Sequence, residues 1–144
     1  MKVLFDSSIF VAAFLNSHPG HTDSLPWLQK VKGKELDGVI SAHSLVEVYS
    51  VLTRLPLSPK ISSPLALHLI KENILNDFEI ITYTKKDYIK LLENLSNSNI
   101  TGGASYDGLI LIAAEKLKID KILTLNIDDF IRVSPQFVRI VQEP

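Results

Sequence analysis

The chain opens with a short apolar run that ends in an acid. Val3-Leu4-Phe5 is followed by Asp6 and two serines, and from Ile9 onward the apolar positions recur with helical spacing. This pattern predicts a buried strand that passes directly into a helix, with Asp6 at the junction. Asp6 is a candidate N-cap of that helix. It is equally a candidate site residue, because open α/β sheets bind ligands at the carboxyl ends of their strands.

Four further apolar runs of strand length follow, at residues 39–41, 78–81, 121–124 and 138–141. The stretches between them carry apolar residues at helical spacing and predict helices, including a short one at 125–130. Strands that alternate with helical connections imply a mostly parallel sheet covered on both faces. The expected fold class is therefore α/β, a three-layer α/β/α sandwich with a central sheet of about five strands.

Length and composition restrict the function classes. The 144 residues are 46% hydrophobic, which suits a single domain over residues 1–144 with a sizeable core. Fifteen basic against sixteen acidic residues leave a net charge of −1. A nucleic-acid partner would therefore be held by a local patch or through metal, because a global basic field is missing. The absence of cysteine excludes disulfides, thiolate metal sites and thiol nucleophiles.

No targeting or membrane-spanning segment is predicted. No stretch approaches the roughly 18 uninterrupted apolar residues of a membrane span, and Met1-Lys2 leads straight into the first strand. We therefore expect a cytoplasmic protein with no membrane association.

Acidic and polar residues recur where a parallel sheet would bring them to its carboxyl edge. Asp6 follows the first strand, Glu47 lies in the early turns of the helix after the second, and Asp107 opens a helix. A polar run after the fourth strand consists of Thr124, Asn126, Asp128 and Asp129. Clustered carboxylates repel unless a cation joins them, and oxygen ligands without cysteine favour Mg²⁺ or Mn²⁺. Such a site suits metal-assisted phosphodiester hydrolysis, although acids at helix starts are also commonly caps or solvated side chains.

Four stretches resemble a known family: residues 6–8, 41–54, 101–110 and 124–130. They are similar to the signature blocks of the PIN domain and, more narrowly, of the VapC-type ribonuclease toxins of bacterial and archaeal toxin–antitoxin pairs. The likeness spans essentially the whole chain, in the family's order and spacing.

The resemblance implies an Mg²⁺-dependent endoribonuclease with a PIN-like fold, in which Mn²⁺ can replace Mg²⁺. Its substrate would be structured RNA such as tRNA. Its partners would be a small antitoxin that occupies the active-site groove and a second copy of the chain in a homodimer.

The resemblance also assigns the acids. Asp6, Glu47 and Asp107 fall on the family's three main acids. Asp6 and Asp107 are thereby expected to bind the metal, and Glu47 to bind it directly or through water and to orient the nucleophile.

The fourth block departs from the family pattern. The family often carries an acid two residues after the threonine, where this chain has Asn126. The second metal position is therefore open between Asn126 and Asp128. Thr124 and Ser7 match small hydroxyl residues that hydrogen-bond near the site, and Arg54 is a candidate RNA contact.

Other families fit less well. A haloacid-dehalogenase-like phosphatase needs a second aspartate two residues after the first, where this chain has Ser8. A phosphoacceptor receiver domain needs an acidic pair and a late lysine that are not convincingly present. The serious alternative is a PIN-like module that binds RNA or protein without catalysis, and Asn126 is the feature that favours it.

Overall fold

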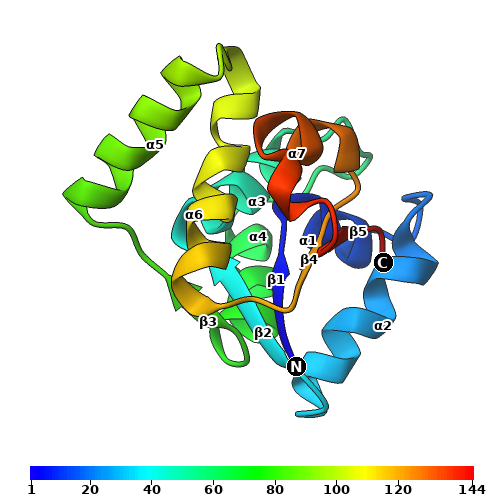
Figure 1. Ribbon diagram of the computed structural model, residues 1–144. Helices are drawn as coiled ribbons and strands as arrows, with labels where there is room; N and C mark the ends of the chain where they lie inside the picture. Colours follow the sequence, from blue (N-terminus) through cyan, green and yellow to red (C-terminus); the bar gives the residue numbers. More distant parts are fainter.

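Five parallel strands form one sheet in the computed structural model, which describes residues 1–144 (Figure 1). They are β1 (Lys2–Phe5), β2 (Asp37–Ser41), β3 (Glu79–Ile81), β4 (Lys121–Leu123) and β5 (Val141–Gln142). Their order across the sheet is β3-β2-β1-β4-β5, and every neighbouring pair is parallel. The predicted fold class is confirmed, and the sheet is parallel throughout.

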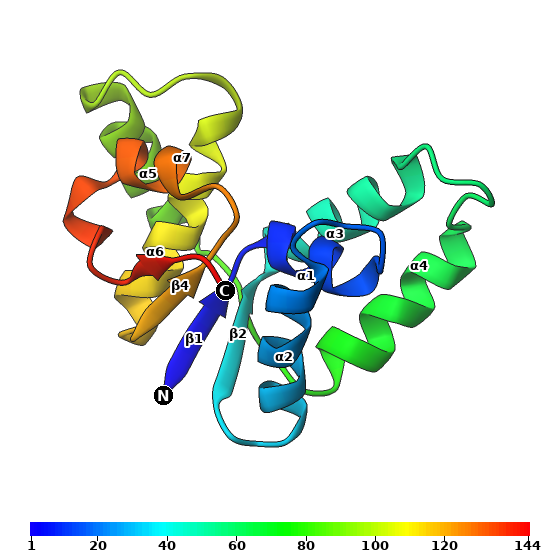
Figure 2. The same cartoon turned by 90° about the vertical axis from the view of Figure 1, so that its right-hand side faces the viewer.

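Helices cover both faces of this sheet (Figure 2). One layer holds α1 (Ser7–Phe14), α2 (His21–Lys32), α3 (Ala42–Arg54) and α4 (Ser63–Ile70), which continues as the π-helical turn η1 (Lys71–Leu75). The other holds α5 (Lys85–Asn97), the 3₁₀ turn η2 (Gly102–Ser105), α6 (Asp107–Leu117), α7 (Ile127–Val133) and the 3₁₀ turn η3 (Pro135–Phe137). None of these helices has the length and apolar character that a membrane crossing requires.

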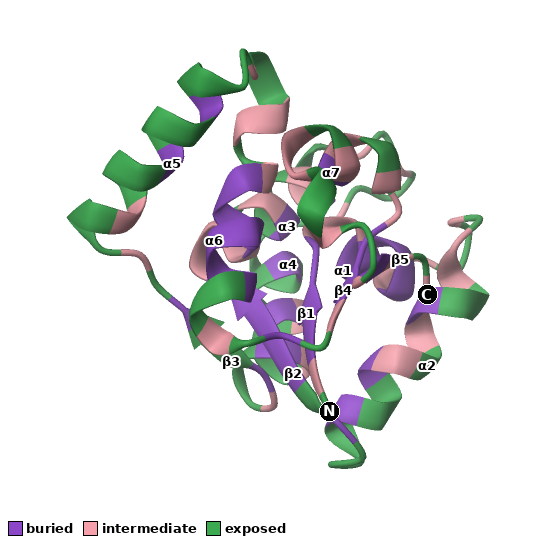
Figure 3. Ribbon diagram, in the orientation of Figure 1, coloured by how far each residue is buried: buried purple, intermediate pink, exposed green.

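The central strand β1 explains why the apolar runs are unbroken. Val3 and Phe5 pack in a cluster with residues of α1 to α4, whereas Leu4 packs on the other side with Ile110 of α6. Successive side chains of a strand point to opposite faces, so a strand covered on both faces must be apolar at every position. Burial is accordingly concentrated in β1, β2, β4, α1 and α6 (Figure 3).

Helix α5 differs from its prediction. Its apolar residues predict a packed face of Tyr88, Leu91, Leu92 and Leu95, but Tyr88 and Leu92 are exposed and only the other two are buried. Leu91 lies so close to α6 that a Cβ atom on Gly108 would overlap it. The missing side chain at this glycine lets the two helices approach along a narrow seam, which leaves the rest of the apolar face uncovered.

The fifth strand is also shorter than the predicted 138–141. Pro135 begins the turn η3, and Ile140 still donates its N–H to the carbonyl of Phe137. Pairing with β4 therefore starts only at Val141, where the backbone becomes extended. A short edge strand of this kind gives other chains little to pair with.

The strand order reverses beside β1. The chain runs from β1 outward to β2 and β3, and then crosses back to place β4 on the opposite side of β1. Open α/β sheets bind ligands at the carboxyl ends of the strands at such a reversal. Asp6 directly follows β1 and Thr124 directly follows β4, so the reversal lies between these two residues.

Candidate active site

Asp6 is a buried carboxylate held by hydroxyl groups. It is 4% exposed, and its Oδ2 accepts hydrogen bonds from Ser8 Oγ at 2.6 Å and Thr124 Oγ1 at 2.9 Å. Asp6 occupies the N-cap position of α1, but its side chain makes no capping hydrogen bond. The carboxylate is therefore turned toward the strand ends rather than used as a helix cap.

Backbone amides orient the two hydroxyls. Ser8 Oγ accepts from the N–H of Leu125 at 3.1 Å, and Thr124 Oγ1 accepts from the N–H of Asn126 at 3.0 Å. Each hydroxyl oxygen already accepts a hydrogen bond, so its own proton is directed at Asp6. Oδ1 of Asp6 has only a 3.4 Å contact from Ser7 Oγ and is thus the atom available to a ligand.

Two further carboxylates face this position. Burial, followed by the charge of Asp6, raises the pKa of Glu47 on α3 to about 7. Burial also raises the pKa of Asp107, at the start of α6, to about 7, with added contributions from the charges of Asp6, Asp129 and Glu47. The structure thus brings Asp6, Glu47 and Asp107 to one edge of the sheet, close enough that the charge of Asp6 contributes to the raised pKa of both other acids.

The donor set fits a hard divalent cation. The three acids at this edge offer carboxylate oxygens, Oδ1 of Asp6 is free of strong partners, and a positive charge would offset the charge crowding that adds to burial in raising the two pKa values. No three His, Asp or Glu side chains stand close enough together to enclose an ion in this arrangement. The oxygen donors of these residues are nevertheless of the chemical type that binds Mg²⁺ or Mn²⁺.

Another residue of the segment after β4, Asp129, lies near Asp107. Asn126 and Asp128 are both exposed, and neither contributes to the pKa of Asp107. Asp129 does contribute, and its Oδ1 accepts a hydrogen bond from Arg132 Nη2 at 3.1 Å. Consecutive residues of a helix point about 100° apart, so only one of the two aspartates of α7 can face α6. Asp129 is therefore the aspartate of α7 that faces Asp107, and the choice of Asn126 or Asp128 for the second metal position stays a prediction.

The chain is similar in sequence to a known family and to proteins of known name. The family model described as PIN domain matches residues 3–134. The chain belongs to the PIN domain family. It is 35% identical over 111 residues to Ribonuclease VapC40 of Mycobacterium tuberculosis, covering 76% of either chain. It is 28% identical over 109 residues to Ribonuclease VapC27 of the same organism, covering 76% of this chain and 74% of the relative. Within its family, this PIN domain belongs to the VapC-type proteins.

Solved structures share the fold. VapC20 of Mycobacterium tuberculosis, described as a sarcin–ricin loop cleaving toxin, aligns with a TM-score of 0.66 at 14% identity, covering 83% of this PIN domain and 86% of that chain. A chain of VapBC2 from Rickettsia felis, bound to a DNA fragment from its promoter, aligns with a TM-score of 0.66 at 23% identity. That match covers 100% of this PIN domain and 99% of the other chain.

Of the two residues predicted to bind RNA, Ser7 adjoins the acid cluster and Arg54 lies outside it. Ser7 lies at the start of α1 beside Asp6, and Arg54 is the exposed last residue of α3. A shallow groove joins Glu47 to Arg54, seven positions or about 10 Å along the helix. Its lining residues are His43, Val46, Glu47, Ser50, Val51 and Arg54.

An aromatic pair that sequence reasoning overlooked lies beside the acids. The imidazole of His43 stacks on the ring of Tyr106, with centroids 4.8 Å apart and planes within 8°. His43 Nε2 is also 3.4 Å from Glu47 Oε1, and burial lowers the pKa of His43. Both residues stand in the sequence stretches that resemble the family, His43 four positions before Glu47 and Tyr106 one before Asp107. This adjacency to two predicted acids is the signal that could have identified the pair.

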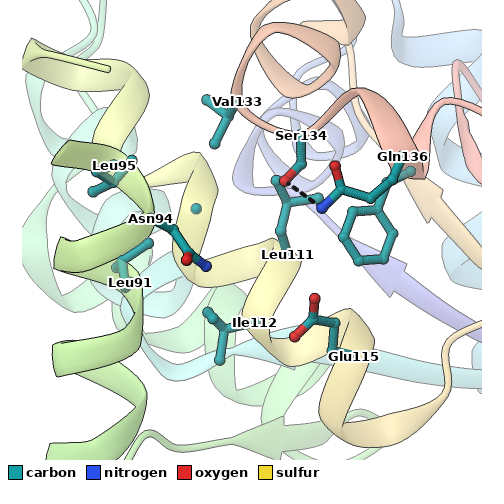
Figure 4. Close-up of a pocket in the computed structure, with 11 residues that line it drawn as sticks. Leu91, Asn94, Leu95, Leu111, Ile112, Glu115, Val133, Ser134 and Gln136 are labelled. Atoms are coloured by element: carbon teal, nitrogen blue, oxygen red, sulfur yellow. Dashed lines mark hydrogen bonds between the residues drawn. The ribbon is translucent and has the colours of Figure 1, made fainter. Parts of the chain in front are cut away.

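A small cavity of this PIN domain lies elsewhere (Figure 4). It lies between α5, α6 and the segment after α7, and its volume of about 30 Å³ suits roughly one water molecule. Its lining includes Leu91, Leu111 and a Gln136 amide that donates to Ser134 Oγ. Glu115 is its single carboxylate, so this cavity lacks the charge cluster found at the strand ends.

Proposed function

We propose that this PIN domain is a metal-dependent endoribonuclease and the toxin of a toxin–antitoxin pair. The observation that carries the proposal is the convergence of Asp6, Glu47 and Asp107 at the strand-order reversal, where burial and then the charges of the other acids raise the pKa of Asp107 to about 7. The names of VapC40 and VapC27, both ribonucleases, support the same activity.

The side chains of the site have different roles in the proposed hydrolysis. Asp6 and Asp107 would hold Mg²⁺ or Mn²⁺, and Thr124 and Ser8 keep Asp6 in one orientation through their hydroxyls. When bound, the divalent cation lowers the pKa of a water molecule and offsets charge on the leaving oxygen. Glu47, whose pKa burial and the charge of Asp6 raise to about 7, would bind the ion directly or through water and orient the attacking water.

The substrate class is structured RNA, with tRNA among the candidates. A net charge of −1 gives no general attraction for phosphates, so recognition relies on local contacts and on RNA shape. Arg54, at the far end of the α3 groove, is suited to a neighbouring phosphate, and Ser7 to one at the metal site. The description of VapC20 as a sarcin–ricin loop cleaving toxin supports a structured target.

The expected protein partner is a small antitoxin that covers the acid groove. VapBC2 and FitAB, whose chains share this fold, are named as paired systems in their DNA-bound structures. A homodimer is proposed as the functional assembly.

The test is cleavage by the purified protein. Mg²⁺ should support endonucleolytic cleavage of total tRNA and ribosomal RNA, and EDTA should abolish it. Asp6→Asn and Asp107→Asn should be inactive while remaining folded, whereas Asp23→Asn, an exposed acid on α2, should retain wild-type activity. Undiminished cleavage by either site variant would refute the assignment.

A second function rests on Asn126, which replaces an acid in the family's fourth block. A PIN-like module with impaired catalysis would bind RNA or protein without cutting it. RNA binding by the wild-type protein with no cleavage in Mg²⁺ or Mn²⁺ would favour this alternative.

A further inference from the structure

Tyr106 offers a flat apolar surface directly beside the acids. Its residue is 54% exposed, although one face of the ring is covered by His43 at 4.8 Å. The accessible part therefore includes the opposite face of the ring.

The backbone holds this ring in place. The N–H of Tyr106 donates to the carbonyl of Gly103, and the carbonyl of Tyr106 accepts from Leu109 in the first turn of α6. The imidazole of His43, fixed on α3, supports the ring from behind. A ring that is already held by its backbone and by a stacked neighbour loses little conformational freedom when a ligand binds to it.

Because the acids of the site repel phosphate, RNA binding there requires a contact that does not depend on charge. Asp6, Glu47, Asp107 and Asp129 oppose the approach of a phosphodiester. Arg132, the cation that acts on Asp107, is bonded to Asp129, and the exposed Arg54 stands about 10 Å along α3 from Glu47. Stacking of a nucleobase on an aromatic ring is insensitive to charge and tolerates any base. It requires a base that is not paired, as in RNA loops.

We propose that the open face of Tyr106 stacks on an unpaired nucleobase of the RNA, next to the phosphate that reaches the acids, with His43 as its support. This inference rests on the proposed ribonuclease function and specifies its substrate: RNA with an unpaired base at the cleavage site. Because Tyr106 directly precedes Asp107, the stacked base and the scissile phosphate belong to the same or adjacent nucleotides.

Measurements of oligonucleotide binding test the stacking proposal without relying on cleavage. The probes are a ten-nucleotide oligoadenylate and an abasic backbone of equal length, both fluorescently labelled and titrated by anisotropy in EDTA. The wild-type protein should prefer the oligoadenylate by about tenfold or more, and Tyr106→Ala should lose that preference while keeping its affinity for the abasic backbone. Tyr106→Phe should restore it.

Tyr88→Ala is the matched control, since Tyr88 is a similarly exposed tyrosine on α5. It should keep the full preference. Thermal unfolding reports whether Tyr106→Ala is folded, and Tyr106→Leu retains the apolar contact with His43 if it is not. A preference that survives Tyr106→Ala and Tyr106→Leu, or that Tyr88→Ala removes as well, overturns the inference.

The outcome is separable from that of the proposed function. If the wild-type protein cleaves RNA but Tyr106 variants bind both probes like wild type, the stacking inference fails and the nuclease stands. If the preference depends on Tyr106 but no RNA is cleaved in Mg²⁺ or Mn²⁺, the stacking surface stands and the nuclease fails.

Discussion

The Thr124 hydroxyl donates to Asp6 Oδ2 at 2.9 Å, a bond between residues 118 positions apart in the chain. Both side chains are buried, and the bond joins the ends of the two strands between which the strand order reverses. The geometry of the acid cluster therefore depends on a residue that bears no charge.

Replacing Thr124 with valine tests this dependence. Valine has nearly the same shape but no hydroxyl, so Asp6 would keep Ser8 as its single short hydrogen-bond donor. We expect metal affinity or cleavage to fall by about 10- to 100-fold, as for other residues that orient a metal ligand. Metal titration and cleavage rates measure the effect. Thr124→Ser keeps the hydroxyl and should retain most activity; equal losses in both variants would argue against a role for the bond.

Neutralising Asp107 should stabilise the metal-free protein at alkaline pH. Folding raises the pKa of Asp107 from 3.8 to about 7, so the folded state binds its proton more tightly than the unfolded state. The contribution of this group to the free energy of unfolding is greatest below about pH 4 and is lost as the pH rises to about 7. Asp107→Asn removes that loss, which we place at about 1–2 kcal/mol because solvent screens this partly exposed side chain.

Thermal unfolding in EDTA measures this effect. Asp107→Asn should melt several degrees above the wild-type protein at pH 8 and close to it at pH 4.5. Asp23→Asn, on the exposed side of α2, should show no such pH-dependent gain. A lower melting temperature for Asp107→Asn at pH 8 would mean that burial and repulsion do not destabilise the charged carboxylate.

Divalent cations should stabilise the wild-type protein. A ligand that binds only the folded state raises the free energy of unfolding by RT ln(1 + [L]/Kd), about 2.7 kcal/mol at 100 times Kd. Mn²⁺ should therefore raise the melting temperature more at pH 8 than at pH 5, because Glu47 and Asp107, each with a pKa of about 7, are protonated at pH 5. Asp6→Asn should abolish the rise. An equal rise at both pH values would place the binding site elsewhere.

The two aspartates of α7 should differ in effect. Asp129 adds to the negative field at Asp107, whereas Asp128 does not. Asp129→Asn is therefore expected to weaken metal binding and cleavage by tenfold or more, an order-of-magnitude expectation for a residue next to the ligands. Asp128→Asn serves as the matched control with little effect. The reverse ranking would restore Asp128 as the fourth acid.

Gly108 should be intolerant of a side chain. A Cβ atom there would overlap Leu91, so Gly108→Ala must push α5 away from α6 at a cost of about 1–3 kcal/mol. Gly103→Ala is a suitable control because nothing lies within 4 Å of its added Cβ. Chemical denaturation measures both changes. Combining Gly108→Ala with Leu91→Ala should recover part of the loss if overlap is the cause.

Much of the fold follows from local patterns. Strands β1 and β2 are apolar on both faces, and this predicts a parallel sheet between two helical layers. Helix α3 ends at Arg54, just before the Leu55-Pro56 step, and α5 begins with the capping box of Thr84 and Asp87. The carboxyl-edge location of Asp6 and Asp107 follows from the same rules, because both directly adjoin a predicted element boundary.

The remaining features depend on contacts between distant elements. Leu92 has the same apolar character as Leu91, and only the approach of α6 at Gly108 decides which of the two is buried. The choice of Asp129 over Asp128 requires knowing that α7 begins at Ile127. The stacking of His43 on Tyr106 joins two residues from separate helical layers, which no local periodicity encodes.

The Asp6–Thr124 bond also bears on how the protein comes into existence. The first strand sits at the middle of the sheet, and one of its two neighbours, β4, is made more than a hundred residues later. A growing polypeptide on the ribosome therefore lacks one of the two short hydroxyl donors to its first acid until nearly the whole chain has emerged. Premature termination anywhere before Thr124 would release a fragment that cannot assemble the catalytic edge.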